Sequence, residues 1–97
     1  MDQLTANELK NWAASGKGFL LIDIREAWER ELYNIGGIHI PMAMLFSHPE
    51  DIPKDKDVVL YCEKGIRSVI AIQRLEAAGF RNLFNLSGGI RAWKETL

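Results

Sequence analysis

The chain has 97 residues, of which 47% are hydrophobic and 26% are charged, and its formal net charge is −1. This length favours one soluble globular domain spanning residues 1–97, with a modest core. The near-neutral charge argues against a general nucleic-acid or membrane-surface binder, because both kinds of binding need concentrated positive charge.

The sequence gives no sign of a membrane span, a secretory signal or a disulfide. No run of eighteen apolar residues is present, so we expect no membrane-spanning helix. The first residues, MDQLTANELKNW, lack the basic and then apolar regions of a secretory signal. Cys62 is the only cysteine, which excludes an internal disulfide and an all-cysteine metal site. These features favour a reducing, cytoplasmic setting.

The chain is predicted to begin with a helix and a buried strand. The stretch TANE has the pattern of a capping box, in which Thr5 caps the helix and Glu8 reaches back to it. We expect this helix to end near Ser15, before two glycines. Residues 19–24 (FLLIDI) form a nearly continuous apolar run, which is typical of a strand buried on both faces.

The next part of the chain is less regular. Residues 25–32 (REAWEREL) have a helical pattern, and residues 33–42 contain the glycines and the proline of a loop. A short strand is expected within that loop at residues 38–40. Residues 43–46 (AMLF) are consistent with one helical turn, before the polar stretch 47–57.

The second half of the chain predicts two strands that alternate with two helices. Residues 58–62 (VVLYC) are rich in β-branched side chains and read as a second buried strand. Residues 67–79 form the strongest predicted helix, with Gly79 at its C-terminal end. We expect a third strand over residues 80–86 and a closing helix over residues 88–97.

Apolar side chains on these helices are expected to face the core. In the helix 67–79 they form a stripe made by Ile70, Leu75 and Ala78. Each tryptophan falls on a different predicted helix, which favours core packing over a stacking platform; the three are Trp12, Trp28 and Trp93.

The order of elements predicts the fold class. Strands separated by helices of this length imply right-handed crossovers, and hence a doubly wound, mainly parallel α/β sheet with helices on both faces. Functional sites in such sheets lie at the carboxyl ends of the strands. Cys62 falls at such an end.

The loop that follows Cys62 has features of a site for a sulfur anion. A strand that turns directly into a helix leaves backbone N–H groups without partners. Gly65 tolerates a positive φ, so the backbone can curl around Cys62 and bring these N–H groups to its sulfur. Together with the positive end of the helix, they would stabilise a thiolate.

The charged residues of the loop have opposite effects on such an anion. Lys64 and Arg67 would stabilise it if their side chains faced inward, whereas Glu63 would oppose it unless it pointed to solvent. A free cysteine is also among the most buried residue types. The residues alone therefore leave open that Cys62 is an inert core side chain.

Most of the chain resembles a single rhodanese (sulfurtransferase) domain, in four segments that come in the family's order. LLIDIREAWERE is similar to the Asp-x-Arg-Glu segment after the first buried strand, and NIGGIHIPM to the Gly-Ile-Pro-rich segment. VVLYCEKGIRS resembles the active-site strand and loop. AAGFRNLFNLSGGIRAW resembles the closing strand, the Gly-Gly turn and the Trp-bearing helix.

The resemblance implies a doubly wound α/β fold with Cys62 as nucleophile and carrier of a persulfide. Asp23 and Arg25 match the family's Asp-x-Arg pair and would brace the site rather than perform the chemistry; a plain salt bridge or strand cap is the alternative. The N–H groups around the sulfur would come from the loop and the first residue of the helix, namely Glu63, Lys64, Gly65, Ile66, Arg67 and Ser68.

The length of the loop separates two chemistries. The related phosphatases of the cell-cycle type use Cys-x5-Arg to surround a phosphate, whereas four residues separate Cys62 from Arg67 here. The tighter loop suits a single added sulfur, so we expect a sulfurtransferase. A phosphatase-like enzyme and a non-catalytic docking module are the alternatives.

The resemblance implies two displacement steps that need no metal and no cofactor, and no Cys/His/Asp spacing suggests a metal site. The donor would be thiosulfate or a protein persulfide. The mixed pair Glu63–Lys64 differs from the loops of thiosulfate-using relatives, which argues against thiosulfate as the physiological donor. With no second cysteine, the acceptor must be external: a small thiol, a protein thiol or cyanide. We expect a monomer that binds neither nucleic acid nor membrane.

Overall fold

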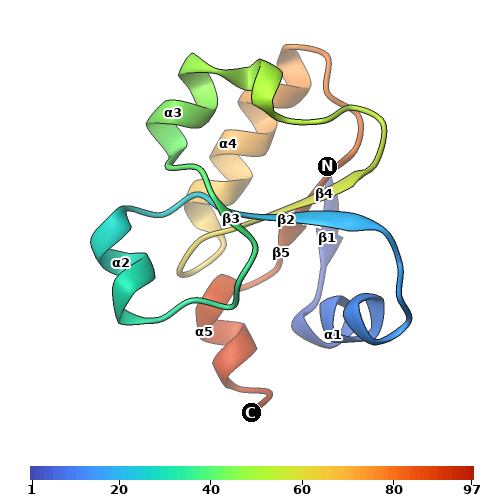
Figure 1. Cartoon of the computed structure of the whole chain (residues 1–97), viewed down its shortest axis with the longest axis vertical. Coiled ribbons are helices and arrows are strands. Elements are labelled where there is room, and N and C mark those ends of the chain that lie inside the picture. Colours follow the sequence, from blue (N-terminus) through green and yellow to red (C-terminus); the bar gives the residue numbers. More distant parts are fainter.

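Five parallel strands form the centre of the fold (Figure 1), in a computed structural model that describes all residues from 1 to 97. In chain order the strands are Asp2–Leu4 (β1), Phe19–Asp23 (β2), Ile38–His39 (β3), Asp57–Tyr61 (β4) and Leu83–Leu86 (β5). Their order in the sheet is β1-β5-β4-β2-β3, and each neighbouring pair is parallel. The predicted α/β fold with a parallel sheet is confirmed.

Helices cover both faces of this sheet. They are Ala6–Ala14 (α1), Ala27–Leu32 (α2), Met42–Ser47 (α3), Ile66–Ala77 (α4) and Gly89–Lys94 (α5), with a 3-10 turn (η1) over Pro49–Asp51. Figure 1 shows α3 and α4 on one side of the sheet and α1 and α5 on the other. None of these helices has the length and apolar character needed to cross a membrane.

Strand β4 separates two apolar clusters and contributes to both. Val58 and Leu60 belong to the cluster under α3 and α4, whereas Val59 and Tyr61 belong to the cluster under α1 and α5. All four side chains are fully buried, as the apolar run VVLYC predicted. Burying one large aliphatic side chain stabilises a fold by about 1.5–3 kcal/mol, so this strand anchors the residues that follow it.

Two predicted helix ends are confirmed in detail. At the start of α1, Thr5 Oγ1 accepts the Glu8 N–H at 3.1 Å, and Glu8 Oε1 accepts the Thr5 N–H at 2.9 Å. After α4, the Gly79 N–H donates to the Glu76 carbonyl at 3.0 Å, and Gly79 has a φ of +105°. Both signals act within a few residues, which is why the sequence reveals them.

Two expectations about core packing are wrong. On α4 the buried residues are Ser68, Ala71, Ile72 and Leu75, whereas Ile70 is 45% exposed. Ile70 lies two residues before Ile72, and a helix turns by about 200° over two residues, so both cannot face the sheet. Ala78 is also exposed.

The second wrong expectation is that Trp28 packs in the core, since its side chain is 64% exposed. It lies on α2, which has no buried residue and follows the carboxyl end of β2 outside the two helical layers. Trp12 and Trp93 do pack against the cluster under α1 and α5, as expected.

The remaining differences concern short elements and element ends. Sequence patterns missed β1 and η1, which have three residues each. Helix α2 begins two residues later than expected, because the Arg25 N–H donates to a carboxylate oxygen of Asp23 at 3.0 Å instead of entering the helix. Strand β5 begins at Leu83 rather than at Phe80. The Phe80 N–H instead donates to the Leu75 carbonyl at the C-terminal end of α4.

Candidate active site around Cys62

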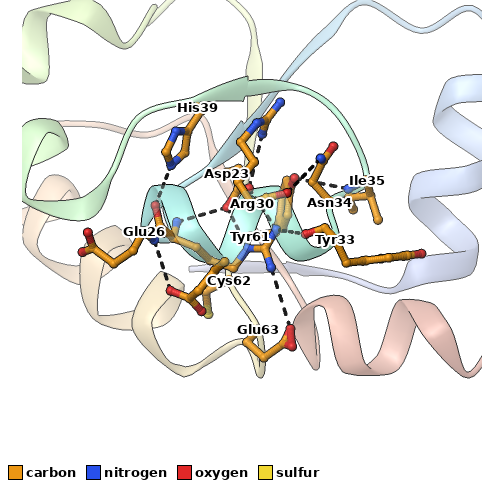
Figure 2. A network of polar contacts seen from close by, with 12 residues as sticks. Asp23, Glu26, Arg30, Tyr33, Asn34, Ile35, His39, Tyr61, Cys62 and Glu63 are labelled. Carbon is orange, nitrogen blue, oxygen red and sulfur yellow. Dashed lines mark hydrogen bonds and ion pairs between the residues drawn. The ribbon is translucent and has the colours of Figure 1, made fainter.

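Cys62 directly follows β4 at the carboxyl edge of the sheet. The neighbouring strand β2 ends at the same level, since Asp23 is paired in register with Tyr61. The fold therefore brings the Asp-x-Arg segment and the cysteine loop to one edge, as predicted (Figure 2). The Cys62 side chain is 1% exposed and forms part of the cluster under α3 and α4.

The loop curls around the sulfur of Cys62. The Gly65 N–H donates to Sγ at 3.2 Å and the Ser68 N–H at 3.4 Å, while the Ser68 hydroxyl lies 3.3 Å from Sγ. Gly65 adopts a φ of +81°, and a Cβ at this position would lie 2.9 Å from the Gly88 nitrogen. A glycine is therefore required where the loop turns.

Helix α5 holds the loop from the other side. The Ile90 N–H donates to the carbonyl of Cys62 and the Arg91 N–H to that of Glu63, both at 3.0 Å. These are first-turn N–H groups, which have no partner within their own helix. A Cβ on Gly89 would collide with the Cys62 carbonyl, so Gly89 allows this close approach.

A buried polar network lies behind the sulfur. The Ser68 hydroxyl donates to Asn85 Oδ1 through a short hydrogen bond. Asn85 Nδ2 in turn donates to Gln3 Oε1 at 2.9 Å and to the Gly65 carbonyl at 3.5 Å. Ser68 and Asn85 are at most 2% exposed. Sequence analysis missed Asn85, although one polar residue within the apolar strand LFNL is a signal, because buried amides need partners.

A pocket of about 390 Å³ opens at the cysteine. It is lined by five residues of the loop and the start of α4, together with one residue of α2; the six are Cys62, Glu63, Lys64, Ile66, Arg67 and Glu29. Lys64 and Ile66 are exposed, whereas Glu63 and Arg67 are partly buried. Six residues were expected around the sulfur. Four of them, Glu63, Lys64, Ile66 and Arg67, line this pocket together with Cys62. The other two, Gly65 and Ser68, contact the sulfur of Cys62.

Glu29 is a pocket residue that the sequence did not reveal. Its carboxylate accepts two hydrogen bonds from the Arg67 guanidinium, at 2.8 and 2.7 Å. This pairing holds the pKa of Glu29 below its usual value and raises the pKa of Arg67. The Arg67 guanidinium is therefore directed at α2 and makes no hydrogen bond to the sulfur.

Asp23 and Arg25 form a buried ion pair beside the loop. Arg25 Nε and Nη2 donate to the two Asp23 oxygens, each at 3.0 Å. Arg30 Nη1 also donates to Asp23, at 3.2 Å, and Figure 2 shows these two labelled residues beside each other. Burial by itself would raise the pKa of Asp23, but the hydrogen bonds from Arg25 outweigh it and hold the pKa below its usual value.

The Asp23–Arg25 ion pair contacts the cysteine loop at Glu63 and not at the sulfur of Cys62. Arg25 Nη1 lies 4.0 Å from Glu63 Oε2, an oxygen that is buried and has no hydrogen-bond partner. Arg25 also lies over the Tyr61 ring, 5.6 Å from its centroid, and its Nη2 donates to the Tyr33 carbonyl at 2.6 Å. These contacts place Arg25 beside the loop, and the bracing role of Asp23 and Arg25 stays a prediction.

Taken together, the groups around Sγ suit a sulfur anion. Two backbone N–H donors point at the sulfur, that of Gly65 at the end of the loop and that of Ser68 in the first turn of α4, and such donors are stabilising next to negative charge. No histidine lines the pocket. The chemistry that this arrangement favours is attack by the cysteine sulfur itself on an electrophilic atom.

Comparisons with known proteins agree with this geometry. The family model of the rhodanese-like domain matches residues 5–96. A sulfurtransferase of Allochromatium vinosum is 35% identical over 94 residues, which cover 96% of this chain and 88% of that protein. The crystal structure of a rhodanese-like domain protein from Staphylococcus aureus has a TM-score of 0.86 at 30% identity and covers 96% of this chain and 91% of that one.

A longer relative shows the same domain as part of a larger chain. The Mycobacterium tuberculosis protein named "Probable adenylyltransferase/sulfurtransferase MoeZ" is 35% identical over 97 residues. The match covers 97% of this chain but only 25% of the length of that relative.

Proposed function

Because this chain belongs to the family of rhodanese-like domains, we propose that it is a sulfurtransferase that carries sulfane sulfur as a persulfide on Cys62. The observation that supports this most is the convergence of the Gly65 and Ser68 N–H groups on Sγ, at 3.2 and 3.4 Å. An inert core cysteine needs no such donors.

The proposed cycle has two displacement steps. The Cys62 thiolate attacks the sulfane sulfur of the donor, an S–S bond forms, and the remainder of the donor leaves with the electron pair of the bond that breaks. An acceptor thiolate or cyanide then attacks the outer sulfur, and Cys62 leaves as a thiolate. Neither step needs a general base when the attacking sulfur or cyanide reacts as the anion, because the leaving group then departs as an anion too.

The loop residues have distinct roles in this proposal. Gly65 and Ser68 stabilise the anionic sulfur through their N–H groups. Glu63, Lys64, Ile66 and Arg67 form the pocket in which the outer sulfur and the donor lie. Asp23, the last residue of β2, and Arg25 hold the loop in place. The donor is thiosulfate or a protein persulfide, and the acceptor is external because the chain has no second cysteine.

The position of Arg67 favours sulfur transfer over phosphatase chemistry. A phosphatase of the Cys-loop type needs its arginine to hold a dianion, but both terminal nitrogens of Arg67 donate to Glu29. A carboxylate in the pocket wall also repels a phosphate. The docking-module alternative requires no reactive cysteine, and the N–H groups at Sγ argue against it.

Intact-mass measurement tests the proposal. The protein is exposed to thiosulfate and, separately, to a protein that carries a persulfide. We expect a mass gain of one sulfur that cyanide removes and that is absent in Cys62→Ser. A folded protein that gains no sulfur from either donor would overturn the proposal, and hydrolysis of an aryl phosphate by the same protein would favour the phosphatase alternative.

A further inference from the structure

The exposed face of α2 carries two large apolar side chains next to the site. Trp28 is 64% exposed and Leu32 is 78% exposed. Large aromatic side chains are enriched in protein–protein contacts and cost free energy when left in water. The core does not use this face, because α2 has no buried residue.

A second hollow along this face adjoins the cysteine pocket. It has a volume of about 320 Å³, and its lining includes Trp28, Leu32, Tyr33 and Lys94. Glu29 and Glu63 line both this hollow and the pocket at Cys62, so the two share a wall. A chain segment that lies along α2 therefore leads to the sulfur.

The charges beside this path favour an acidic partner. Both carboxylates of the shared wall already have a cation within the chain, since Arg67 pairs with Glu29 and Arg25 lies 4.0 Å from Glu63. By contrast, Lys64 and Lys94 form no ion pair with any carboxylate of the chain, and Lys94 Nζ lies 4.4 Å from the centroid of the Tyr33 ring.

We infer that the face made by Trp28, Leu32, Lys94 and Lys64 is the docking surface for a protein partner that exchanges sulfur with Cys62. The partner presents a cysteine on an extended segment, with an apolar side chain that packs on Trp28 and Leu32 and carboxylates that pair with the two lysines. The exchange of sulfur between this partner and Cys62 rests on the proposed function, whereas the docking of the partner does not.

The test uses mixed-disulfide formation, which needs only the Cys62 thiolate. In this reaction Cys62 attacks a peptide cysteine that is activated as a 2-pyridyl disulfide, a Cys62–peptide disulfide forms, and pyridine-2-thiolate leaves. Three peptides of equal length are compared: one with Leu-Phe before the cysteine and Asp/Glu flanks, one with Leu-Phe and Lys flanks, and one with Ser-Gly and Asp/Glu flanks. The measured quantity is the second-order rate of thiolate release.

We expect the apolar acidic peptide to react about tenfold faster than either of the other two, since one good contact at an interface is worth about that factor. Trp28→Ala should remove the advantage over the Ser-Gly peptide, and Lys94→Gln should reduce the advantage over the Lys-flanked peptide. Met44→Ala, at an exposed apolar site on α3 (50%), should change neither. The small probe 2,2′-dipyridyl disulfide should react at one rate with all four proteins.

Equal rates for the three peptides, or a full preference retained in Trp28→Ala, would overturn the inference. Either result leaves the proposed function intact if Cys62 still gains sulfur from a donor. Conversely, a protein that gains no sulfur but keeps the peptide preference retains its docking surface and loses its proposed chemistry.

Discussion

Arg67 and Glu29 form a two-point ion pair that joins the first turn of α4 to α2, with nitrogen–oxygen distances of 2.8 and 2.7 Å. Glu29 also accepts the Glu26 N–H at 3.1 Å and so helps to begin α2. One carboxylate thereby fixes the cysteine loop relative to the docking face on α2 and occupies the arginine that a phosphatase would need.

We predict that Glu29→Gln destabilises the fold by about 1 kcal/mol at neutral pH, because a partly exposed ion pair contributes about that much. The pKa of Glu29 is lowered in the folded state, so its stabilisation is present above the unfolded value of about 4.5. This stabilisation is lost as the pH falls through the lower pKa that Glu29 has in the folded protein. Urea unfolding at neutral and acidic pH should show the difference from wild type disappearing in acid. A difference that is the same at both pH values would contradict this.

We predict that Asp23→Asn is much more destabilising than loss of a surface ion pair. Asp23 is fully buried and bound by Arg25 and Arg30, and removing one partner of a buried pair costs about 3–5 kcal/mol. Asp57→Asn is the matched control, because Asp57 pairs with Lys17 at 3.0 Å where both side chains are more than a third exposed. That change should cost about 0–1 kcal/mol. Urea midpoints measure both, and similar losses would show that Asp23 does not brace the edge of the sheet.

We predict that Asn85→Leu makes Cys62 more reactive toward iodoacetamide. In the wild-type protein the Ser68 hydroxyl donates to Asn85. Without that acceptor the hydroxyl is free to donate to Sγ of Cys62, which lies 3.3 Å away. Such a hydrogen bond to a thiolate should raise the alkylation rate at neutral pH by about threefold to tenfold.

Asn82→Leu is the control for this change. It removes the same group, but the Asn82 amide donates to the Pro53 and Lys56 carbonyls, away from the cysteine. It should lower stability without changing the alkylation rate. An unchanged rate in Asn85→Leu, or an equal rise in both variants, would argue against the role assigned to the Ser68 hydroxyl.

We predict that Gly89→Ala impairs the site from a distance. Its Cβ would collide with the Cys62 carbonyl, so α5 must move and its N–H groups must leave the loop. The cost should be about 1–3 kcal/mol, together with slower gain of sulfur from a donor. Gly18→Ala is the control, since a Cβ there meets nothing within 4 Å. The thermal unfolding temperature and the rate of sulfur loading should change in Gly89→Ala only. A destabilised Gly89→Ala protein that gains sulfur at the normal rate would show that α5 does not support the reaction at Cys62.

Local signals in the sequence predicted the frame of the site. The apolar run VVLYC placed Cys62 at a strand end, and Gly65 placed the turn, because both depend on residues that are adjacent in the chain. The capping box of Thr5 and Glu8 is a signal of the same kind.

Which residues contact the loop could not be predicted in this way, even where a residue such as Asn85 stands out locally. Glu29, Asn85 and Gly89 reach it through contacts between distant segments. Nothing local marks Glu29, rather than Glu26 or Glu31, as the partner of Arg67. The exposure of Trp28 depends likewise on where α2 lies relative to the sheet, since its helical pattern is equally compatible with burial.

The most direct test of persulfide chemistry at Cys62 follows one sulfur atom through a single turnover. The protein is loaded with a donor, freed of small molecules and treated with cyanide, while its mass and the thiocyanate released are both measured. We predict one thiocyanate for each protein that loses a sulfur, peptide mapping that places the sulfur on Cys62, and no reaction in Cys62→Ser. Sulfur that maps elsewhere, or thiocyanate release that persists in Cys62→Ser, would contradict the account.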